Sequence, residues 1–141
     1  QPTPPVERLS VFEGTWTRED APATVTFRET CAWLAGGRRH MVCQGEYRSA
    51  NRVTQMLKVF SVREQTYVVF AAIGDSPAST YTGGPDGDRW IFNLQSERPG
   101  NPQRRRIVIT PARDRIRFVE ESSANDGPWQ TTEDYSYIRI K

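Results

Sequence analysis

The chain has 141 residues, of which 36% are hydrophobic and 26% charged, and its mean hydropathy is −0.68. This size fits one domain, and the longest run of strongly apolar residues, 68–73, is far shorter than the ~18 residues of a membrane-spanning helix. The 17 Arg and two Lys are interleaved with 17 acidic residues and leave a net charge of +2, so the charge pattern does not indicate nucleic acid as a partner.

The residue types favour β-structure. Thr, Val and Ile together number 31, against four Leu and two Lys. Because β-branched residues favour strands whereas Leu and Lys favour helices, the composition predicts an all-β domain.

The first five residues, Gln-Pro-Thr-Pro-Pro, predict an extended segment. A start without Met is typical of a mature exported protein whose signal peptide has been removed, and we expect export to the periplasm or secretion. A trimmed sequence is the alternative. Next, Val6, Leu9 and Phe12 lie at helical spacing, so residues 6–12 are expected to form a short helix across an open end of a barrel.

From Gly14 onward, apolar and polar residues alternate with a period close to two, as in half-buried strands. Turn signals rich in Gly, Pro, Asn and Asp divide this pattern into ten expected strands: residues 14–18, 24–34, 38–48, 52–62, 66–74, 78–82, 88–95, 104–110, 115–122 and 128–140. Residues 96–102 form the one longer loop, which we expect to be mobile. These short connections favour a single up-and-down antiparallel β-barrel over residues 6–141, since a sandwich needs longer crossovers.

The two cysteines flank the expected hairpin at Gly36-Gly37. A three-residue loop centred on Gly37 places Cys31 directly opposite Cys43, whereas a two-residue Gly-Gly turn misses that register by one. Facing residues on neighbouring strands are ~4.5–5.5 Å apart, which suits a disulfide. We predict this bridge, with two buried free thiols as the alternative. It agrees with export, because cytosolic thiols stay reduced.

Gly14-Thr15-Trp16 follows the expected helix and resembles the G-x-W signature of the lipocalin and calycin barrels. In those barrels the Trp plugs the closed end against a basic residue of the last strand, so the resemblance implies a structural pair of Trp16 and Arg139. The chain also resembles an uncharacterised bacterial lipocalin-like family, domain of unknown function 1579, at residues 12–16, 33–38, 59–62, 67, 86–88, 129 and 137–139. This resemblance implies a ten-stranded barrel with an internal cavity and no defined reaction.

If the cysteines share the inner face, alternation also places inside the barrel Glu29, Trp33, Arg39, Met41 and Tyr47. The one His of the chain, His40, then points outward and cannot hold a haem in the interior. A lone His without a Cys-x-x-Cys also cannot complete a zinc site. We therefore expect no metal and no cofactor.

The last two strands bring acidic residues together. In the register of Trp129, Glu133 and Tyr135 share a face with Arg139, and Glu120 lies near them on the preceding strand. Two carboxylates in an apolar cavity have pKa values that are pushed apart, as acid–base catalysis requires, and an Arg–Tyr pair suits a ligand carboxylate. In the alternative, these residues line a wet mouth or face solvent through a one-residue register slip.

The sequence therefore predicts a barrel that sequesters a small apolar or amphipathic ligand, with no nucleic acid as a partner. The expected ligand-binding residues are Phe27, Glu29, Trp33, Phe92, Phe118, Glu120, Glu133 and Tyr135. Two alternatives stay open. The protein is a small-molecule isomerase, cyclase or hydrolase with an inward carboxylate as base, or it is an envelope protein that acts through its surface and has a barrel filled by side chains.

Overall fold

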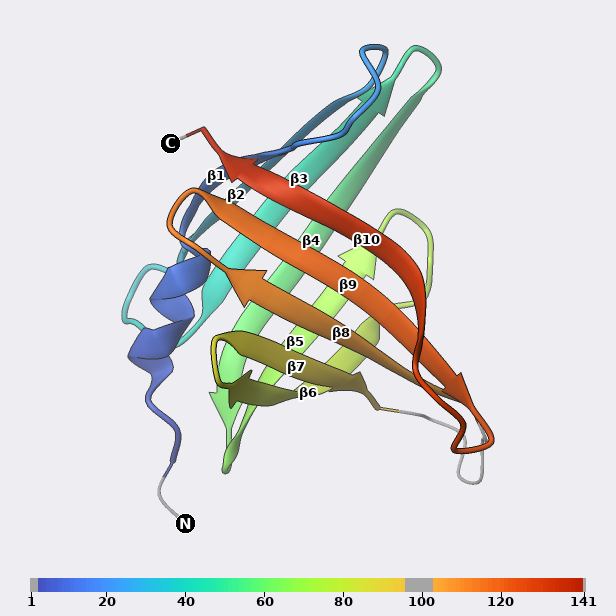
Figure 1. The fold of residues 1–141 in the computed structure, drawn as a ribbon. Coiled ribbons are helices and arrows are strands. Elements are labelled where there is room, and N and C mark those ends of the chain that lie inside the picture. The colour runs from blue at the N-terminus through green and yellow to red at the C-terminus, as the bar shows by residue number, and fades with distance from the viewer. Residues whose placement is uncertain (1–2, 96–102, 141) are drawn as a thin grey trace.

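The computed structural model describes residues 3–95 and 103–140, and over these residues the chain forms a closed antiparallel barrel (Figure 1). The elements are η1 (Val6–Phe12), β1 (Gly14–Arg18), β2 (Thr26–Trp33), β3 (Met41–Ser49), β4 (Arg52–Arg63), β5 (Thr66–Ile73), β6 (Ser79–Asp86), β7 (Arg89–Leu94), β8 (Gln103–Pro111), β9 (Arg115–Ala124) and β10 (Gln130–Arg139). Each strand pairs with its sequence neighbours, and β10 pairs with β1. The predicted all-β, up-and-down barrel is confirmed.

Two expectations concern residues that the structure does not describe. Residues 96–102, which we expect to form a mobile loop, lie outside the described ranges, and so do residues 1–2 of the segment expected to be extended. Within those ranges the only helix is η1, which is far too short to cross a membrane.

Alternating burial gives the sheet one inner face. In β2, Phe27, Glu29 and Cys31 are buried, while the residues between them are exposed. The same alternation holds at the start of β3 and β9 and through β7. Because the sheet is closed, no strand edge is left unpaired among the described residues, and the inward side chains of the strands share one interior.

The helix η1 closes one end of this interior. It is a 3₁₀ helix, whose three residues per turn match the spacing of Val6, Leu9 and Phe12, so all three lie on one side. Leu9 and Phe12 are buried. The Phe12 ring stacks on Phe60 of β4, with 4.5 Å between the centroids, and meets Trp90 of β7 edge-on at 5.3 Å.

Trp16 of β1 contacts Arg139 of β10 at the same closed end of the barrel, where the first and last strands pair. Its ring is fully buried, and its indole N–H donates to the Phe12 carbonyl at 3.1 Å. Arg139 is its partner across the β1–β10 pairing and lies 4.3 Å above the ring. The Arg139 guanidinium also donates to the carbonyls of Glu13 and Arg113. This is the contact that the resemblance implied.

The predicted disulfide between Cys31 and Cys43 is present, and the two residues face each other across β2 and β3. The connecting loop is longer than expected, because β2 ends at Trp33, β3 begins at Met41, and Leu34 N–H donates to the His40 carbonyl. The loop is still centred on Gly37, so the register of the cysteines is unchanged. The prediction that Arg39 points inward is wrong, since Arg39 lies exposed in this loop.

The turn expected over residues 83–87 is much shorter in the structure. Strand β6 continues through Gly83 and Gly84 to Asp86, and the chain turns at Gly87, whose φ is +67°. A Cβ at Gly83 would lie 1.9 Å from the Ile91 carbonyl oxygen of β7. Gly83 therefore permits a close approach of two strands instead of a turn.

A third correction concerns Trp129. The pairing of β9 with β10 shifts register between Thr131 and Glu133, which changes the face of the residues that precede the shift. The Trp129 ring lies 4.1 Å from the guanidinium of Arg106, which forms an ion pair with Glu121. Arg106 and Glu121 lie beside inward residues, so Trp129 packs on the outer face and does not share the face of Glu133.

We expect the double variant Cys31→Ala/Cys43→Ala to retain the fold with a free energy of unfolding lower by about 2–3 kcal/mol, because the disulfide restricts the unfolded chain. Urea unfolding of the oxidised protein and of the variant measures this difference. Reduction of the wild-type protein is the control and should move its midpoint in the same direction. An unchanged midpoint in both cases would contradict a structural role for the bridge.

Candidate ligand-binding cavity

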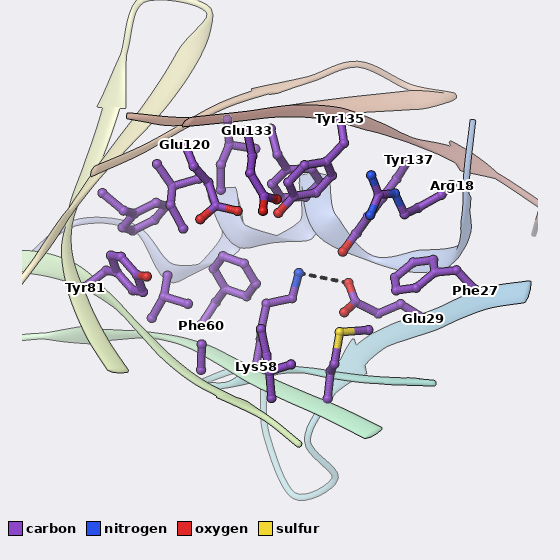
Figure 2. A pocket seen from close by; sticks show the side chains of 18 of the residues that line it. Arg18, Phe27, Glu29, Lys58, Phe60, Tyr81, Glu120, Glu133, Tyr135 and Tyr137 are labelled. Carbon is purple, nitrogen blue, oxygen red and sulfur yellow. Dashed lines mark ion pairs between the residues drawn. The ribbon is translucent and has the colours of Figure 1, made fainter. Parts of the chain in front are cut away.

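Between its closed end and its opposite end, the barrel encloses a cavity of about 340 Å³ (Figure 2). Its walls are largely apolar and come from most of the strands, with the aliphatic and aromatic residues Phe27, Phe60, Val69, Phe92, Ile107, Ile109 and Phe118. This volume falls in the range of ~300–1,000 Å³ that is usual for small-molecule sites. The interior of this barrel is therefore only partly filled by side chains.

The structure brings most of the predicted site residues to this cavity. Its lining includes Phe27, Glu29, Phe92, Phe118, Glu120, Glu133 and Tyr135. Trp33 does not line it, because it ends β2 near the closed end, where it packs against the core with the Arg38 guanidinium 6.0 Å from its ring.

The prediction that Arg139 lies beside Glu120 and Glu133, which rests on the face of the strand that it shares with Glu133, is wrong. Arg139 lies six residues beyond Glu133, or about 20 Å along an extended strand at ~3.4 Å per residue, and it covers Trp16 instead. Alternation predicted the face of the residue but not its height in the barrel.

Several polar lining residues were missed by the sequence reasoning, above all Lys58 and Arg18. A signal for them existed. Lys58 lies two residues before Phe60 on β4, and Arg18 two residues after Trp16 on β1, so each shares an inner face with a large aromatic residue. In an alternating pattern, charged residues at inner positions are candidates for a cavity.

Lys58 and Glu29 form an ion pair on the cavity wall, with 3.0 Å between Nζ and Oε1 (Figure 2). The Glu29 side chain is 2% exposed and that of Lys58 is 17% exposed. The ammonium also lies 5.1 Å from the ring centre of Phe118 and 5.2 Å from that of Tyr137, so two aromatic faces contribute to holding the cation. Lys58 is therefore held in place from three sides.

The second carboxylate oxygen of Glu29, Oε2, is buried and has no hydrogen-bond partner among the described residues. The Cys31 sulfur lies 3.9 Å from Oε1, but a disulfide sulfur carries no proton and cannot donate. A buried acceptor without a donor is costly, so Oε2 is available to a hydroxyl or water from a bound molecule.

Glu120 and Glu133 lie opposite each other on β9 and β10, and both line the cavity. Burial raises the pKa of the Glu120 carboxyl, and the charge of Glu133 raises it further, against a hydrogen bond from Tyr135 and the nearby Arg105 and Lys58. Both carboxyls also border a polar groove of about 330 Å³ with Gln103 and Arg105. The acidic pair therefore lies where the apolar cavity meets a polar surface.

Two tyrosines keep their protons in this setting. Burial raises the pKa of Tyr137 well above its usual value, and the charge of Glu29 adds to that effect. Burial raises the pKa of Tyr135 in the same way. Both phenols are therefore neutral hydrogen-bonding groups and not bases.

In the described part of the chain, one group of side chains has the spacing of metal ligands, namely Glu29, Cys31 and Cys43, whose ligand atoms lie within 4.8 Å of one another. Both sulfurs are in the disulfide and are not thiolates, so they do not suit a metal ion. His40 does not line the cavity, and its Nδ1 lies 2.8 Å from the Ser61 hydroxyl.

Comparison with protein-family models gave no match, and no curated protein matches the chain. The assignment to a lipocalin-like family thus stays a prediction from sequence motifs.

We expect Lys58→Met to destabilise the protein by about 3 kcal/mol, because it leaves a buried carboxylate at Glu29 without its counter-ion. The double variant Glu29→Gln/Lys58→Met should recover most of that loss, since neither charge is left in the wall. Urea unfolding of both variants measures the difference. A double variant as unstable as Lys58→Met alone would show that packing, and not charge, causes the loss.

The acidic pair predicts a pH-dependent stability. Because the folded-state pKa of Glu120 is raised, its contribution to stability is complete when the carboxyl is protonated and is lost as the pH rises through that pKa. We therefore expect Glu120→Gln to raise the thermal midpoint at pH 7 and to have little effect below about pH 4.

Thermal unfolding followed by circular dichroism at several pH values measures this difference. The exposed Glu13 supplies the matched control, Glu13→Gln, which removes the same formal charge from outside the cavity. Equal pH profiles for the two variants would contradict the effect of burial at Glu120.

Proposed function

We propose that the protein binds a small amphipathic molecule inside its barrel. The observation that carries this proposal is the cavity of about 340 Å³, whose walls are mostly apolar and into which a few polar groups converge. A barrel filled by side chains, as a protein acting only through its surface would have, leaves no such space.

The walls supply the affinity. A ligand that buries ~200 Å² of apolar surface against these walls gains about 5 kcal/mol, at ~25 cal/mol per Å². The polar groups orient the ligand. One side of the cavity carries Glu120, Glu133 and Tyr135, and another side carries the Lys58–Glu29 pair. The apolar part of a ligand would lie between these two polar groups.

We also propose that the protein works in an exported, oxidising compartment. The disulfide between Cys31 and Cys43 is compatible with the periplasm or with secretion. The resemblance to lipocalin-like barrels supports the same picture of a binding protein with an internal cavity.

A second candidate function is acid–base catalysis on a small molecule, and the acidic pair favours it. Glu120 has a raised pKa and lies opposite Glu133 at the cavity, so the Glu120 carboxyl is suited to hold and release a proton there. An isomerase, cyclase or hydrolase can use such a pair as its general acid and general base. If turnover of a bound molecule is found, Glu120→Gln should abolish it and leave the molecule bound.

The test of binding blocks the cavity without changing its charges. Ala71 lines the cavity and its neighbour Ala72 does not, because the two residues point to opposite faces of β5. We expect Ala71→Trp to weaken binding of the neutral fluorescent probe N-phenyl-1-naphthylamine at least about tenfold, which is ~1.4 kcal/mol.

Ala72→Trp is the matched control and should bind the probe as the wild type does. Fluorescence titration measures both affinities. Equal affinities in the two variants would place the probe outside the barrel, and no binding by the wild type would count against the proposed function itself.

A further inference from the structure

Lys58 differs from every other basic position of the described chain. The sequence has 17 Arg and two Lys, and the other lysine, Lys141, lies outside the described residues. Arg is usually the better partner in a buried ion pair, because its planar guanidinium can form two parallel hydrogen bonds with a carboxylate. At nearly every other basic position this chain has Arg, yet the residue paired with Glu29 in the cavity wall is Lys.

Lys can do one thing there that Arg cannot. Its amine can lose a proton and attack an electrophilic carbon, whereas a guanidinium stays protonated. Lys58 Nζ is close to a buried base, at 3.0 Å from Glu29 Oε1, and its side chain lines the cavity. Figure 2 shows the amine extending inward between Glu29 and the aromatic rings.

We propose that Lys58 forms a reversible imine with the carbonyl group of an apolar aldehyde or ketone bound in the cavity. This inference rests on the proposed function, because the carbonyl compound must first enter the barrel. It assigns a chemical class to the ligand and a covalent step to a residue that simple sequestration does not require.

The step balances without an oxidant or a reductant. Lys58 gives a proton to Glu29, and its free amine attacks the carbonyl carbon, so a C–N bond forms and the carbonyl oxygen takes up a proton from the nitrogen. Glu29 then returns its proton to that hydroxyl, the C–O bond breaks and water leaves. The product is a protonated imine, which has the same charge as the ammonium that it replaces.

Two features of the wall fit this course. The unpartnered Glu29 Oε2 can accept a hydrogen bond from the hydroxyl of the intermediate, whereas in the free protein this oxygen has no donor among the described residues. The protonated imine keeps the positive charge beside Glu29 and near the rings of Phe118 and Tyr137, so the contacts that hold the ammonium also hold the product.

The experiment traps the imine. The wild-type protein is incubated with octanal and sodium cyanoborohydride, which reduces imines to stable amines, and the modified residues are found by peptide mass spectrometry. We expect Lys58 to be alkylated at least tenfold faster than Lys141. An excess of 1-octanol, which can occupy the cavity but cannot form an imine, should protect Lys58 and leave Lys141 unprotected.

Arg28→Lys supplies an internal standard, because Arg28 neighbours Glu29 on the exposed face of β2. In that variant, Lys58 should still react at least tenfold faster than the introduced surface amine, and the added change Glu29→Gln should slow the reaction at Lys58 alone. Reaction of Lys58 no faster than the surface amine would overturn the inference.

The probe titration on the same protein separates the two proposals. If the wild type binds N-phenyl-1-naphthylamine inside the barrel but Lys58 is not trapped, the imine is wrong and the binding function stands. If the wild type binds neither the probe nor octanal, the proposed function fails as well.

Discussion

The pairing of β1 with β10 is the constraint on which the rest of the structure depends. It consists of only three facing residue pairs, and one of them joins Trp16 to Arg139. That pair adds an aromatic contact and two hydrogen bonds to carbonyls of the flanking segments. Because the sheet closes here, no edge remains among its ten strands and every inward side chain shares one interior.

The closed interior is filled unevenly along its length. At one end, η1 and the aromatic residues Phe12, Trp16, Phe60 and Trp90 pack against one another. Towards the other end the side chains do not meet, and the cavity remains. The disulfide of Cys31 and Cys43 lies on the inner face between Glu29 and Met41, so it joins two strands of the wall next to the charged pair.

Charge is distributed in this interior in two different ways. The Lys58–Glu29 pair is balanced and enclosed, with one carboxylate oxygen left without a donor among the described residues. Glu120 and Glu133 face each other with like charge, and burial together with this repulsion raises the pKa of Glu120. The cavity therefore has an ion pair, Lys58–Glu29, on one side and two like-charged carboxyl groups, Glu120 and Glu133, on another. The two ends of a bound molecule meet different polar groups.

By itself, the sequence determined the faces of most strands, and with them the barrel, the disulfide and most of the residues that line the cavity. This is possible because successive side chains of a strand point to opposite faces, so inward residues recur at every second position of the sequence. The tertiary structure decided the loop lengths, the register between strands and the height of each residue along the barrel, none of which follows from this alternation. The hairpin loop put Arg39 in solvent, and the contact of Gly83 with β7 made a strand of an expected turn. The register shift put Trp129 outside, and height along the barrel separated Trp33 and Arg139 from the carboxylates. Each of these depends on how far one strand is displaced against its neighbour, and that displacement is set only when all ten strands close.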